Sequence, residues 1–561
     1  MSEEKVSSLP KSIDLSHHLS NLAKSRNVSP LKDLQKYIQR PGLIQMAGGL
    51  PDPTLFPIET LHIDALVSNS FAKKNAKSSS FFGWIWSMFG GAPAPKTETY
   101  TVNKFAATPE EIDMAHALQY SSAGGTTQLQ AFFREFTQKV YTPAYADWIT
   151  LAHCGNTDGT TRCFATFCNP GDSVVVEEWT YPSALSTARP MGIKMVPVKV
   201  DGQGMAAVDL ERVLSTWDEN VQGRRPRVMY TVPIGQNPTG ATMGTERKLA
   251  IYDICVRYGT LFLFINFSLS TFSSSEKSDM LIIEDDPYYF LQEGTYVPKS
   301  LRAKMQSQNE DDPMVFLNSL TPSYLKFDYQ GRVIRLDSFS KIIAPGSRMG
   351  WFTCNPLFAE RLERHGETNT QAPCGFSQSI IVQLITKQWG MKKFIRWLQG
   401  LQGEYTSRRD FMVDTLYELF DVAPATGEAA AFGAGLPVMT AYLKEPTNTI
   451  TSISEKYKAV ASKTPLFSFI PPTAGMFVWI KFHVGQNVIL KPGETLTMHI
   501  FTDLAEEGLL IAPGTMFNVD ESIILEREVA FRISFSSGTH TGYKVLITND
   551  SKSKCPRVSR F

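Results

Sequence analysis

The chain has 561 residues, of which 43% are hydrophobic and 20% charged, and its 55 basic side chains are balanced by 55 acidic ones. This length predicts more than one domain, and the zero formal net charge excludes broad nucleic-acid binding, which requires a basic surface. The seven cysteines are odd in number and form no CxxC pair, which indicates reduced thiols rather than disulfides or a metal site.

Residues 1–57 are predicted to form an N-terminal arm. The opening MSEEKVSSLPKS has neither an apolar core nor an Arg-rich pattern, so it does not indicate a targeting peptide. Further on, LIQMAGGLPDPTLFP is interrupted by glycines and prolines, which is typical of an extended loop. The longest apolar stretch, TLFLFINFSLSTF, is shorter than the roughly 20 residues that a membrane span needs. We therefore expect a cytoplasmic protein without a membrane span.

Residues 58–390 are predicted to form a large α/β domain. Residues 78–105 join the aromatic FFGWIWSMFGG to APAPKTETY without a sustained helical or strand period, and we predict an inserted loop there. From about Tyr120 to Asn355, helical stretches alternate with short apolar segments, namely DSVVVEEW, KMVPVKV, RVMYTVPI, MLIIEDD, VIRLDSFS and MGWFTCN. This alternation predicts a sheet with helices on both faces.

Residues 391–537 are predicted to form a smaller α+β domain. It begins with the long helical segment KKFIRWLQGLQGEYTSRRDFMVDTLYELF and includes the strand-like MFVWIKF and VAFRISF. Residues 538–561 show no apolar stripe at helical spacing, and we treat them as an atypical tail.

Three motifs follow predicted strands and carry polar side chains. Each has an ordinary structural interpretation when it is taken alone: a capping turn for NPTG, an acidic strand end for DDPYY, and a solvated loop for SFSK. The candidate residues are Asn237 in NPTG, Asp285 and Tyr288 in EDDPYYF, and Ser338, Ser340, Lys341 and Arg348 in DSFSKIIAPGSRMGW.

In this order, the three motifs resemble those of the aspartate-aminotransferase superfamily of fold-type I pyridoxal-phosphate enzymes. The segments GGLPDPTLFP, ALQYSSAGG, YTVPIGQNPTG, IIEDDPYYFLQ, SFSKIIAPGSRMGW and FRISFSS are similar to the kynurenine/α-aminoadipate aminotransferases and especially to fungal aromatic-amino-acid aminotransferases. The resemblance runs from about Leu15 to Ser537. It implies a mostly parallel seven-stranded sheet in the large domain and pyridoxal 5′-phosphate as the cofactor.

The resemblance also implies a role for each residue around the cofactor ring. Lys341 would hold the cofactor as a Schiff base and then move the proton between Cα and the cofactor C4′. Asp285 would pair with the pyridinium N–H and keep the ring an electron sink. Tyr288 and Asn237 would donate hydrogen bonds to the 3′ oxygen, and Tyr181 would stack on the ring face.

By the same resemblance, the cofactor phosphate would be bound by Ser338, Ser340 and Arg348. The backbone N–H groups of Asn156 and Thr157, in HCGNTDGTT, would join them at a helix N-terminus. Relatives usually have serine or an alanine-like residue where Asn156 stands, so this chain departs from the family pattern there.

Substrate binding and assembly follow from the resemblance as well. Arg532, in VAFRISFSS, would bind the substrate α-carboxylate with its planar guanidinium, together with Asn237 and Gly49. Tyr120 matches a tyrosine that reaches the phosphate of the neighbouring subunit, which implies a homodimer with shared active sites.

The implied activity is amino transfer between an aromatic or 2-aminoadipate-like L-amino acid and a 2-oxo acid such as 2-oxoglutarate. A decarboxylase, a β-lyase or a racemase would use the same lysine, aspartate and phosphate-binding residues, so these activities stay open. A transcription regulator with an aminotransferase-like domain is the alternative from a different class, but the balanced charge and the short lead before AGGLPDP argue against it.

Two segments have no counterpart in the relatives. Residues 260–278 insert an apolar, Ser-rich stretch just before the strand that ends in Asp285, and residues 538–561 replace an expected closing helix. We interpret one or both as translated introns, which peptide mass spectrometry of the native protein tests. If both are genuine, a dimer inactivated by the insertions is the third alternative.

Overall fold

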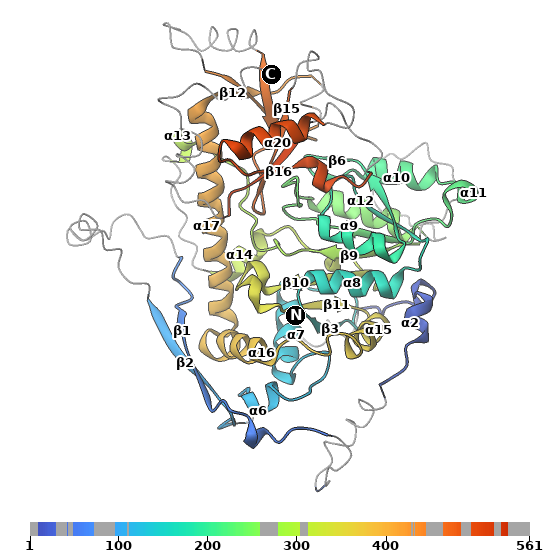
Figure 1. Cartoon of the computed structure of the whole chain (residues 1–561), viewed down its shortest axis with the longest axis vertical. Helices are drawn as coiled ribbons and strands as arrows, with labels where there is room; N and C mark the ends of the chain where they lie inside the picture. The colour runs from blue at the N-terminus through green and yellow to red at the C-terminus, as the bar shows by residue number, and fades with distance from the viewer. Residues whose placement is uncertain are drawn as a thin grey trace, which may run out of the picture. The chain divides into compact units, whose positions relative to one another are not determined.

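The computed structural model describes residues 9–29, 42, 49–71, 96–108, 111–257, 279–302, 312–427, 430, 432–444, 464–483, 495–520 and 529–536 (Figure 1). The chain forms two compact units, residues 1–166 with 310–404 and residues 167–309 with 405–561. The predicted segments 260–278 and 538–561, and the predicted loop from 78 to 95, lie outside the described residues. The predicted domain boundaries after residues 57, 390 and 537 stay predictions.

The first unit contributes three strands to a sheet. Strand β11 (Gly350–Cys354) runs antiparallel to both of its neighbours, β10 (Val333–Ser338) and β3 (Ile149–His153). Helices α7 (Thr127–Val140) and α15 (Pro356–Glu367) pack against β3. The sequence pattern predicted β10 and β11 but missed β3, whose five residues lie between a loop and a helix.

Aromatic side chains fill the core between α7 and these strands. Phe133 stacks on Trp351 with ring centroids 4.5 Å apart, and Phe136 meets the same indole edge-on at 5.8 Å. All three side chains are fully buried, and pairs in these geometries add to the free energy gained by area burial alone. The packing holds α7 against the strands β3 and β11.

A β-hairpin corrects part of the predicted loop 78–105. Strands β1 (Thr60–Leu66) and β2 (Thr97–Asn103) pair antiparallel over seven residues each. In β2 the side chains of Tyr100 and Val102 are buried while their neighbours are more exposed, so the segment TETYTVN alternates as a strand does. The sequence pattern did not predict this strand, because the aromatic and Pro-rich run before it hides the short alternation.

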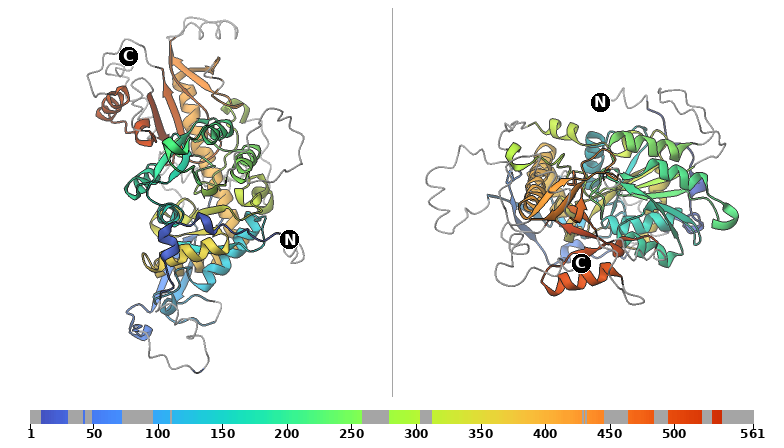
Figure 2. Two further views of the ribbon diagram at one scale, coloured as in Figure 1. Left: turned by 90° about the vertical axis from the view of Figure 1, so that its right-hand side faces the viewer. Right: turned by 90° about the horizontal axis from the view of Figure 1, so that it is seen from above.

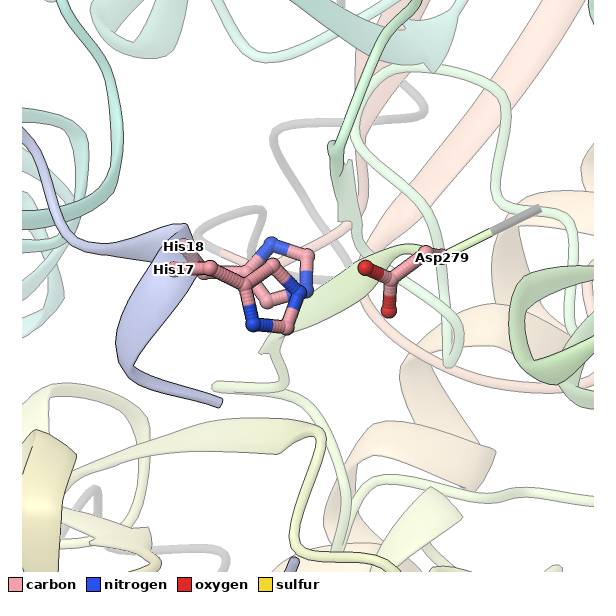
Figure 3. Close-up of side chains that lie close together, drawn as sticks. All are labelled: His17, His18 and Asp279. Atoms are coloured by element: carbon pink, nitrogen blue, oxygen red, sulfur yellow. The ribbon is translucent and has the colours of Figure 1, made fainter. Parts of the chain in front are cut away.

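Figure 3 shows two histidines of the short helix η1 (Ser16–His18). The rings of His17 and His18 have centroids 4.3 Å apart. Figure 3 also draws Asp279, which belongs to the second unit, and we assign no metal site to these side chains. The other helices that begin in the first unit are α2 (Asn21–Ser25), η2 (Pro53–Leu55), α6 (Met114–Ala117), α8 (Asn156–Phe167), α14 (Pro313–Ser319), η4 (Tyr324–Lys326), η5 (Phe339–Lys341), η6 (Pro345–Ser347), α16 (Gly375–Val382), η7 (Gln383–Gln388) and α17 (Gly390–Leu419).

The second unit contributes four parallel strands in the order β9 (Leu281–Asp285), β8 (Val228–Thr231), β4 (Ser173–Glu177) and β5 (Lys194–Val198). The first three are buried along their whole length, as expected for strands covered on both faces. The strand order of the complete seven-stranded sheet is β3-β11-β10-β9-β8-β4-β5, which confirms the predicted fold class.

The second unit also contains a six-stranded antiparallel sheet. Its order is β12 (Phe420–Pro424), β13 (Met439–Leu443), β14 (Pro465–Phe469), β15 (Phe477–Phe482), β17 (Val529–Ser534) and β16 (Ala512–Pro513). Helix α20 (Leu496–Glu506) packs on β16 and β17 (Figure 2). The sequence predicted β15 and β17 but not the other strands, which are short or partly exposed. The remaining elements are α9 (Pro182–Ala188), η3 (Arg189–Met191), β6 (Val200–Asp201), β7 (Gly204–Met205), α10 (Ala207–Ser215), α11 (Glu219–Gln222), α12 (Thr245–Val256), α13 (Lys299–Arg302) and η8 (Gly514–Phe517).

Within the part of the chain that the structure describes, no helix combines the length and the apolar character needed to cross a membrane.

The buried imidazole of His153 makes the stability of the protein depend on pH. Burial lowers the pKa of His153 from 6.5 to about 3, so only the unfolded chain takes up this proton between those values. The stability that the neutral His153 contributes to the folded state is complete above pH 6.5 and is lost progressively as the pH falls below that value. For this group alone, we expect the free energy of unfolding to drop by about 1.4 kcal/mol between pH 7.5 and 5.5.

Urea unfolding of wild type and His153→Gln at both pH values tests this prediction. The buried Glu177, whose pKa is raised to about 7, changes the free energy of unfolding in the opposite direction over this pH range. The slope of the free energy of unfolding against pH is therefore compared between wild type and the variant rather than with zero. The exposed His116 gives a matched control, His116→Gln, which should keep the wild-type slope. Equal slopes for wild type and His153→Gln would contradict the prediction.

Candidate active site

The turn after β10 presents three of the predicted residues. The Ser338 hydroxyl accepts a hydrogen bond from the Ser340 backbone N–H (3.0 Å) and donates one to the Ser340 hydroxyl (2.8 Å). This cap starts the one-turn helix η5, and the buried Phe339 anchors it. Lys341 is therefore the last residue of a fixed turn, and it is half-buried.

Arg348 lies beside this turn. Its backbone is left-handed, with φ of +46°, directly after the helix η6. The guanidinium donates to the Ser340 hydroxyl (3.5 Å), to the Pro345 carbonyl (3.1 Å) and to the Cys154 carbonyl (3.0 Å). The hydroxyls and the guanidinium thus meet at one end of β10.

The N-terminus of α8 completes this group. Asn156, its first residue, donates from its side chain to the Leu336 carbonyl of β10 (3.2 Å), and Thr157 follows it. The first N–H groups of a helix have no acceptor within the helix, and the helix dipole favours an anion there. The carboxylate of Asp158 in the same turn is paired with Arg162 (2.7 Å). Hydroxyls, a guanidinium and a helix N-terminus together have the chemistry of a phosphate site.

Gly155 is required for the close approach of Arg348 to this helix. Its φ is +88°, and a Cβ built on it would lie 2.5 Å from Arg348 Nη2. We expect Gly155→Ala to displace the guanidinium and to weaken cofactor binding by roughly tenfold or more. Absorbance titration of the apoenzyme with pyridoxal 5′-phosphate measures this.

Gly171 provides the matched control for that substitution. Its φ is +92°, and a Cβ built on it would meet no atom within 4 Å. Gly171→Ala therefore carries the same backbone strain without the contact to Arg348. The two variants should lose similar stability, and only Gly155→Ala should lose cofactor affinity; equal affinities would contradict the assignment.

In the second unit, β9 ends in the buried carboxylate of Asp285. The Tyr230 hydroxyl, in β8, donates a hydrogen bond to Asp285 Oδ2 (2.6 Å). Burial, followed by the neighbouring Asp285, raises the pKa of Tyr230 well above 10, so the phenol keeps its proton. The sequence motifs did not single out Tyr230. Tyr230 pairs with Ile283 in the strand register, and side chains two residues apart share a face, so the pairing of β8 with β9 places Tyr230 beside Asp285.

Tyr288 lies just beyond this strand. It is buried and meets Phe477 of β15 edge-on, with ring centroids 5.8 Å apart. Burial and the charge of Asp285 raise the pKa of Tyr288, which leaves a protonated phenol that can donate a hydrogen bond. Tyr181 is half-buried at the start of α9.

Arg532 of β17 is held by a hydrogen bond and by two aromatic rings. Its Nη1 donates to the Asn237 side-chain oxygen (2.8 Å), and its guanidinium lies over the rings of Phe477 (4.4 Å) and Phe517 (4.9 Å). Burial lowers the pKa of Arg532. Among the residues that the structure describes, no acceptor is bound to its buried Nε. A half-buried guanidinium with an unused donor suits a carboxylate ligand.

The NPTG turn approaches β15 very closely. Gly240 has φ of +70°, and a Cβ on it would lie 2.5 Å from the Phe477 carbonyl oxygen. This close packing fixes the turn that carries Asn237. A glycine is therefore needed at the end of this motif for a physical reason.

Glu177 is a buried acid that the sequence motifs did not place in the site. Its Oε1 accepts hydrogen bonds from the Thr231 hydroxyl (2.5 Å) and from the Val232 N–H (3.2 Å). Burial raises its pKa to about 7. Its position at the end of β4 was the only sequence signal.

The predicted residues divide between the two units. Those expected at the phosphate, together with Lys341 and Gly49, belong to the first unit, and those expected at the ring nitrogen and the 3′ oxygen, together with Arg532, belong to the second. Tyr120 is 62% exposed. Gly49 is exposed, and a Cβ on it would meet no atom within 4 Å, so the structure adds nothing to its predicted role.

Residues 104–434 match the family described as aminotransferase class I and II. The chain belongs to this family. It is 32% identical over 540 residues to an aromatic amino acid aminotransferase of Schizosaccharomyces pombe, covering 95% of this chain and 96% of the relative. It is 31% identical over 525 residues to an L-tyrosine:2-oxoglutarate aminotransferase of Serpula lacrymans, covering 91% and 85%.

A solved aminotransferase structure agrees with this. The crystal structure of the aminotransferase Aro8 from Candida albicans is similar, with a TM-score of 0.73 and 32% identity over 96% of this chain and 97% of that one. Pyridoxal 5′-phosphate is the cofactor of class I and II aminotransferases. The residues of this aminotransferase fit it, because the first unit offers an anion cradle beside Lys341 and the second offers a buried carboxylate and a buried phenol.

Proposed function

We propose that this aminotransferase moves the amino group between an aromatic L-amino acid and a 2-oxo acid such as 2-oxoglutarate. The relatives named above carry these substrates in their names. The observation that supports the proposal most directly is Arg532, whose guanidinium is fixed by Asn237 and two phenyl rings and whose Nε has no acceptor among the described residues. An α-carboxylate is common to the amino acid and the 2-oxo acid, so one arginine serves both half-reactions.

Lys341 acts as the nucleophile and as the acid–base group in this proposal. Its amine would hold the cofactor through the aldehyde carbon and, when free, would carry a proton from or to the substrate Cα. The rigid turn from Ser338 to Lys341 keeps this amine in place. Bound pyridoxal 5′-phosphate supplies the electron sink that takes up the electron pair of the broken Cα–H bond.

The other residues bind and orient. Asp285, held by the Tyr230 hydroxyl, places a negative charge for the ring nitrogen. Tyr288 and Asn237 would donate to the 3′ oxygen of the bound cofactor, and Tyr181 would stack on its ring. These assignments rest on the family resemblance together with the burial of Asp285, Asn237 and Tyr288.

The phosphate is assigned to the group at the ends of β10 and α8. Ser338, Ser340 and Arg348 supply side-chain donors, and the N–H groups of Asn156 and Thr157 supply the helix N-terminus. An anion here gains hydrogen bonds from groups that the fold already holds in position.

We also propose that the protein acts as a homodimer in the cytoplasm. Tyr120 is exposed, as needed for a side chain that reaches the phosphate of a partner subunit. Sedimentation of the holoenzyme, and loss of cofactor affinity in Tyr120→Phe, would support shared sites.

Spectra of the two half-reactions test the proposed activity. Holoenzyme mixed with L-phenylalanine or L-tyrosine should change to the pyridoxamine form and return when 2-oxoglutarate is added. A decarboxylase or a lyase would not complete this cycle, and an enzyme inactivated by the segment 260–278 would show neither change. Comparison with L-2-aminoadipate ranks the substrates.

Arg532→Lys tests the carboxylate site. We expect kcat/KM for the amino acid to fall by roughly 10- to 100-fold, because lysine keeps the charge but cannot form two parallel hydrogen bonds. The matched control is Arg212→Lys in the surface ion pair with Asp209, which should leave kcat/KM unchanged. A change below twofold in Arg532→Lys would contradict the assignment.

A further inference from the structure

The carboxyl group of Glu177 joins two strand ends that lead to residues of the proposed site. Strand β4 ends at Glu177 and is followed by Tyr181, and strand β8 ends at Thr231 and is followed by Asn237. The two strands are parallel neighbours, and their register places Glu177 beside Thr231. A side-chain link at this point therefore sets the spacing of the two segments that leave the sheet.

One oxygen of Glu177 makes this link. Its Oε1 accepts a hydrogen bond from the Thr231 hydroxyl (2.5 Å) and another from the Val232 N–H (3.2 Å). All three residues are buried, so water does not replace the acceptor. Loss of this oxygen would take away the partner of a buried hydroxyl and of a buried N–H, which is costly. The link is therefore a strong restraint on the end of β8.

A second hydrogen bond joins the same two segments beyond the strands. The Gln236 side chain, which is buried, donates to the Trp179 carbonyl oxygen (2.6 Å). The next residue, Asn237, accepts a hydrogen bond from Arg532 (2.8 Å). The spacing that is set at Glu177 thus extends to Asn237 and, through it, to Arg532.

The protonation of Glu177 fits a role as a hydrogen-bond acceptor rather than as a charge. Burial and, to a smaller extent, the charge of Asp285 raise the pKa of Glu177 to about 7. Among the residues that the structure describes, the buried Oε2 has no hydrogen-bond partner. A glutamine can therefore keep the acceptor while its NH2 group takes the place of Oε2, which separates the acceptor from the charge.

We propose that Glu177 is a positioning residue for the cofactor ring: its acceptor oxygen holds the segment of Tyr181 and the segment of Asn237 at the spacing that the ring needs. This inference rests on the proposed function, in which Tyr181 stacks on the ring and Asn237 donates to the 3′ oxygen. Glu177 acts through these two residues, because its own hydrogen bonds go to the end of β8.

Glu177→Met and Glu177→Gln test the proposal as a pair. Methionine has a similar length but no acceptor oxygen, whereas glutamine keeps one. We expect Glu177→Met to raise the Kd for pyridoxal 5′-phosphate, measured by titration of the apoenzyme, by about tenfold. It should also weaken the visible circular dichroism of the bound cofactor, which reports how the ring is held. Glu177→Gln should keep the wild-type dichroism and a Kd within twofold of wild type.

Two further variants serve as controls. Leu210 is buried in α10, which carries no residue of the proposed site, so Leu210→Ala loses stability through a cavity and should keep the wild-type Kd and dichroism. Thr231→Val keeps the shape of the side chain but removes one of the two donors to Glu177. It should raise Kd by about threefold and add nothing to Glu177→Met in the double variant, because both changes break the same link.

Three results would overturn the proposal: unchanged Kd and dichroism in Glu177→Met, an equal loss in Glu177→Gln, or an equal loss in Leu210→Ala. If Glu177→Met does not fold, an unchanged Kd in Thr231→Val overturns it instead. Neither measurement needs turnover. Failure of the half-reaction spectra would therefore contradict the proposed function while the role of Glu177 is decided separately.

Discussion

Lys341→Ala is expected to abolish transamination, with kcat reduced by at least about 10,000-fold. The variant loses the amine that binds the cofactor and, with it, the base that moves the proton at Cα, and the loss of one member of such a unit costs nearly as much as the loss of all of it. The cofactor should still bind, because the hydroxyls and the guanidinium of Arg348 at the end of β10 are unchanged.

Steady-state assays and borohydride reduction measure this prediction. Reduction of wild-type holoenzyme, followed by peptide mapping, should place the cofactor on Lys341 alone. Lys326→Ala removes an exposed lysine shortly before β10 and should keep full activity. Label on another lysine, or more than one per cent of the activity in Lys341→Ala, would show that the nucleophile is wrongly assigned.

Asp285→Asn is expected to lower kcat by roughly 100- to 1,000-fold. The carboxylate is 4% exposed and receives the Tyr230 hydroxyl at 2.6 Å, so an asparagine fits the space but removes the charge. A buried cation that loses its partner costs about 3–5 kcal/mol. The ring nitrogen of the cofactor would then lose its proton, and the carbanion step would slow.

The neighbouring acid gives a matched control for this substitution. Asp286 is 2% exposed and follows Asp285 directly, so Asp286→Asn removes a charge with nearly the same burial. We expect it to alter stability but to leave kcat within tenfold of wild type. The cofactor absorbance spectrum should change with pH only in Asp285→Asn. A larger loss of kcat in Asp286→Asn than in Asp285→Asn would assign the pairing with the ring nitrogen to Asp286 instead.

The strands of the large sheet could be predicted because their residues carry the signal locally. LIIED, VMYT and SVVVE each contain a run of three hydrophobic residues, and each strand is buried along its whole length. The short strand β3 and most of the six-stranded sheet gave no such signal. In β13 and β14, pairing with neighbouring strands rather than local pattern decides the conformation, since β-structure depends on partners that lie far away in the sequence.

The residues of the candidate site also divide into those with a local sequence signal and those without one. Lys341, Asp285 and Asn237 were predicted from the sequence because each stands at or just after a strand end in a short motif, and the three motifs in this order resemble one family. Tyr230, which donates to Asp285, and the buried Glu177 were missed, because a tyrosine or a glutamate at a strand end has no distinctive motif. The rings of Phe477 and Phe517 under Arg532 come from separate strand and helix segments, and only the folded chain brings them together.

The family and the fold class were predicted from the amino-acid sequence, because short motifs in a fixed order indicate the family and the alternation of helical and strand-like segments indicates the fold class. The folded chain was needed to establish which groups are buried and which hydrogen bonds hold them. Burial and pairing join residues that are hundreds of positions apart, as in the bond from Arg532 to Asn237, and no local pattern records such a contact.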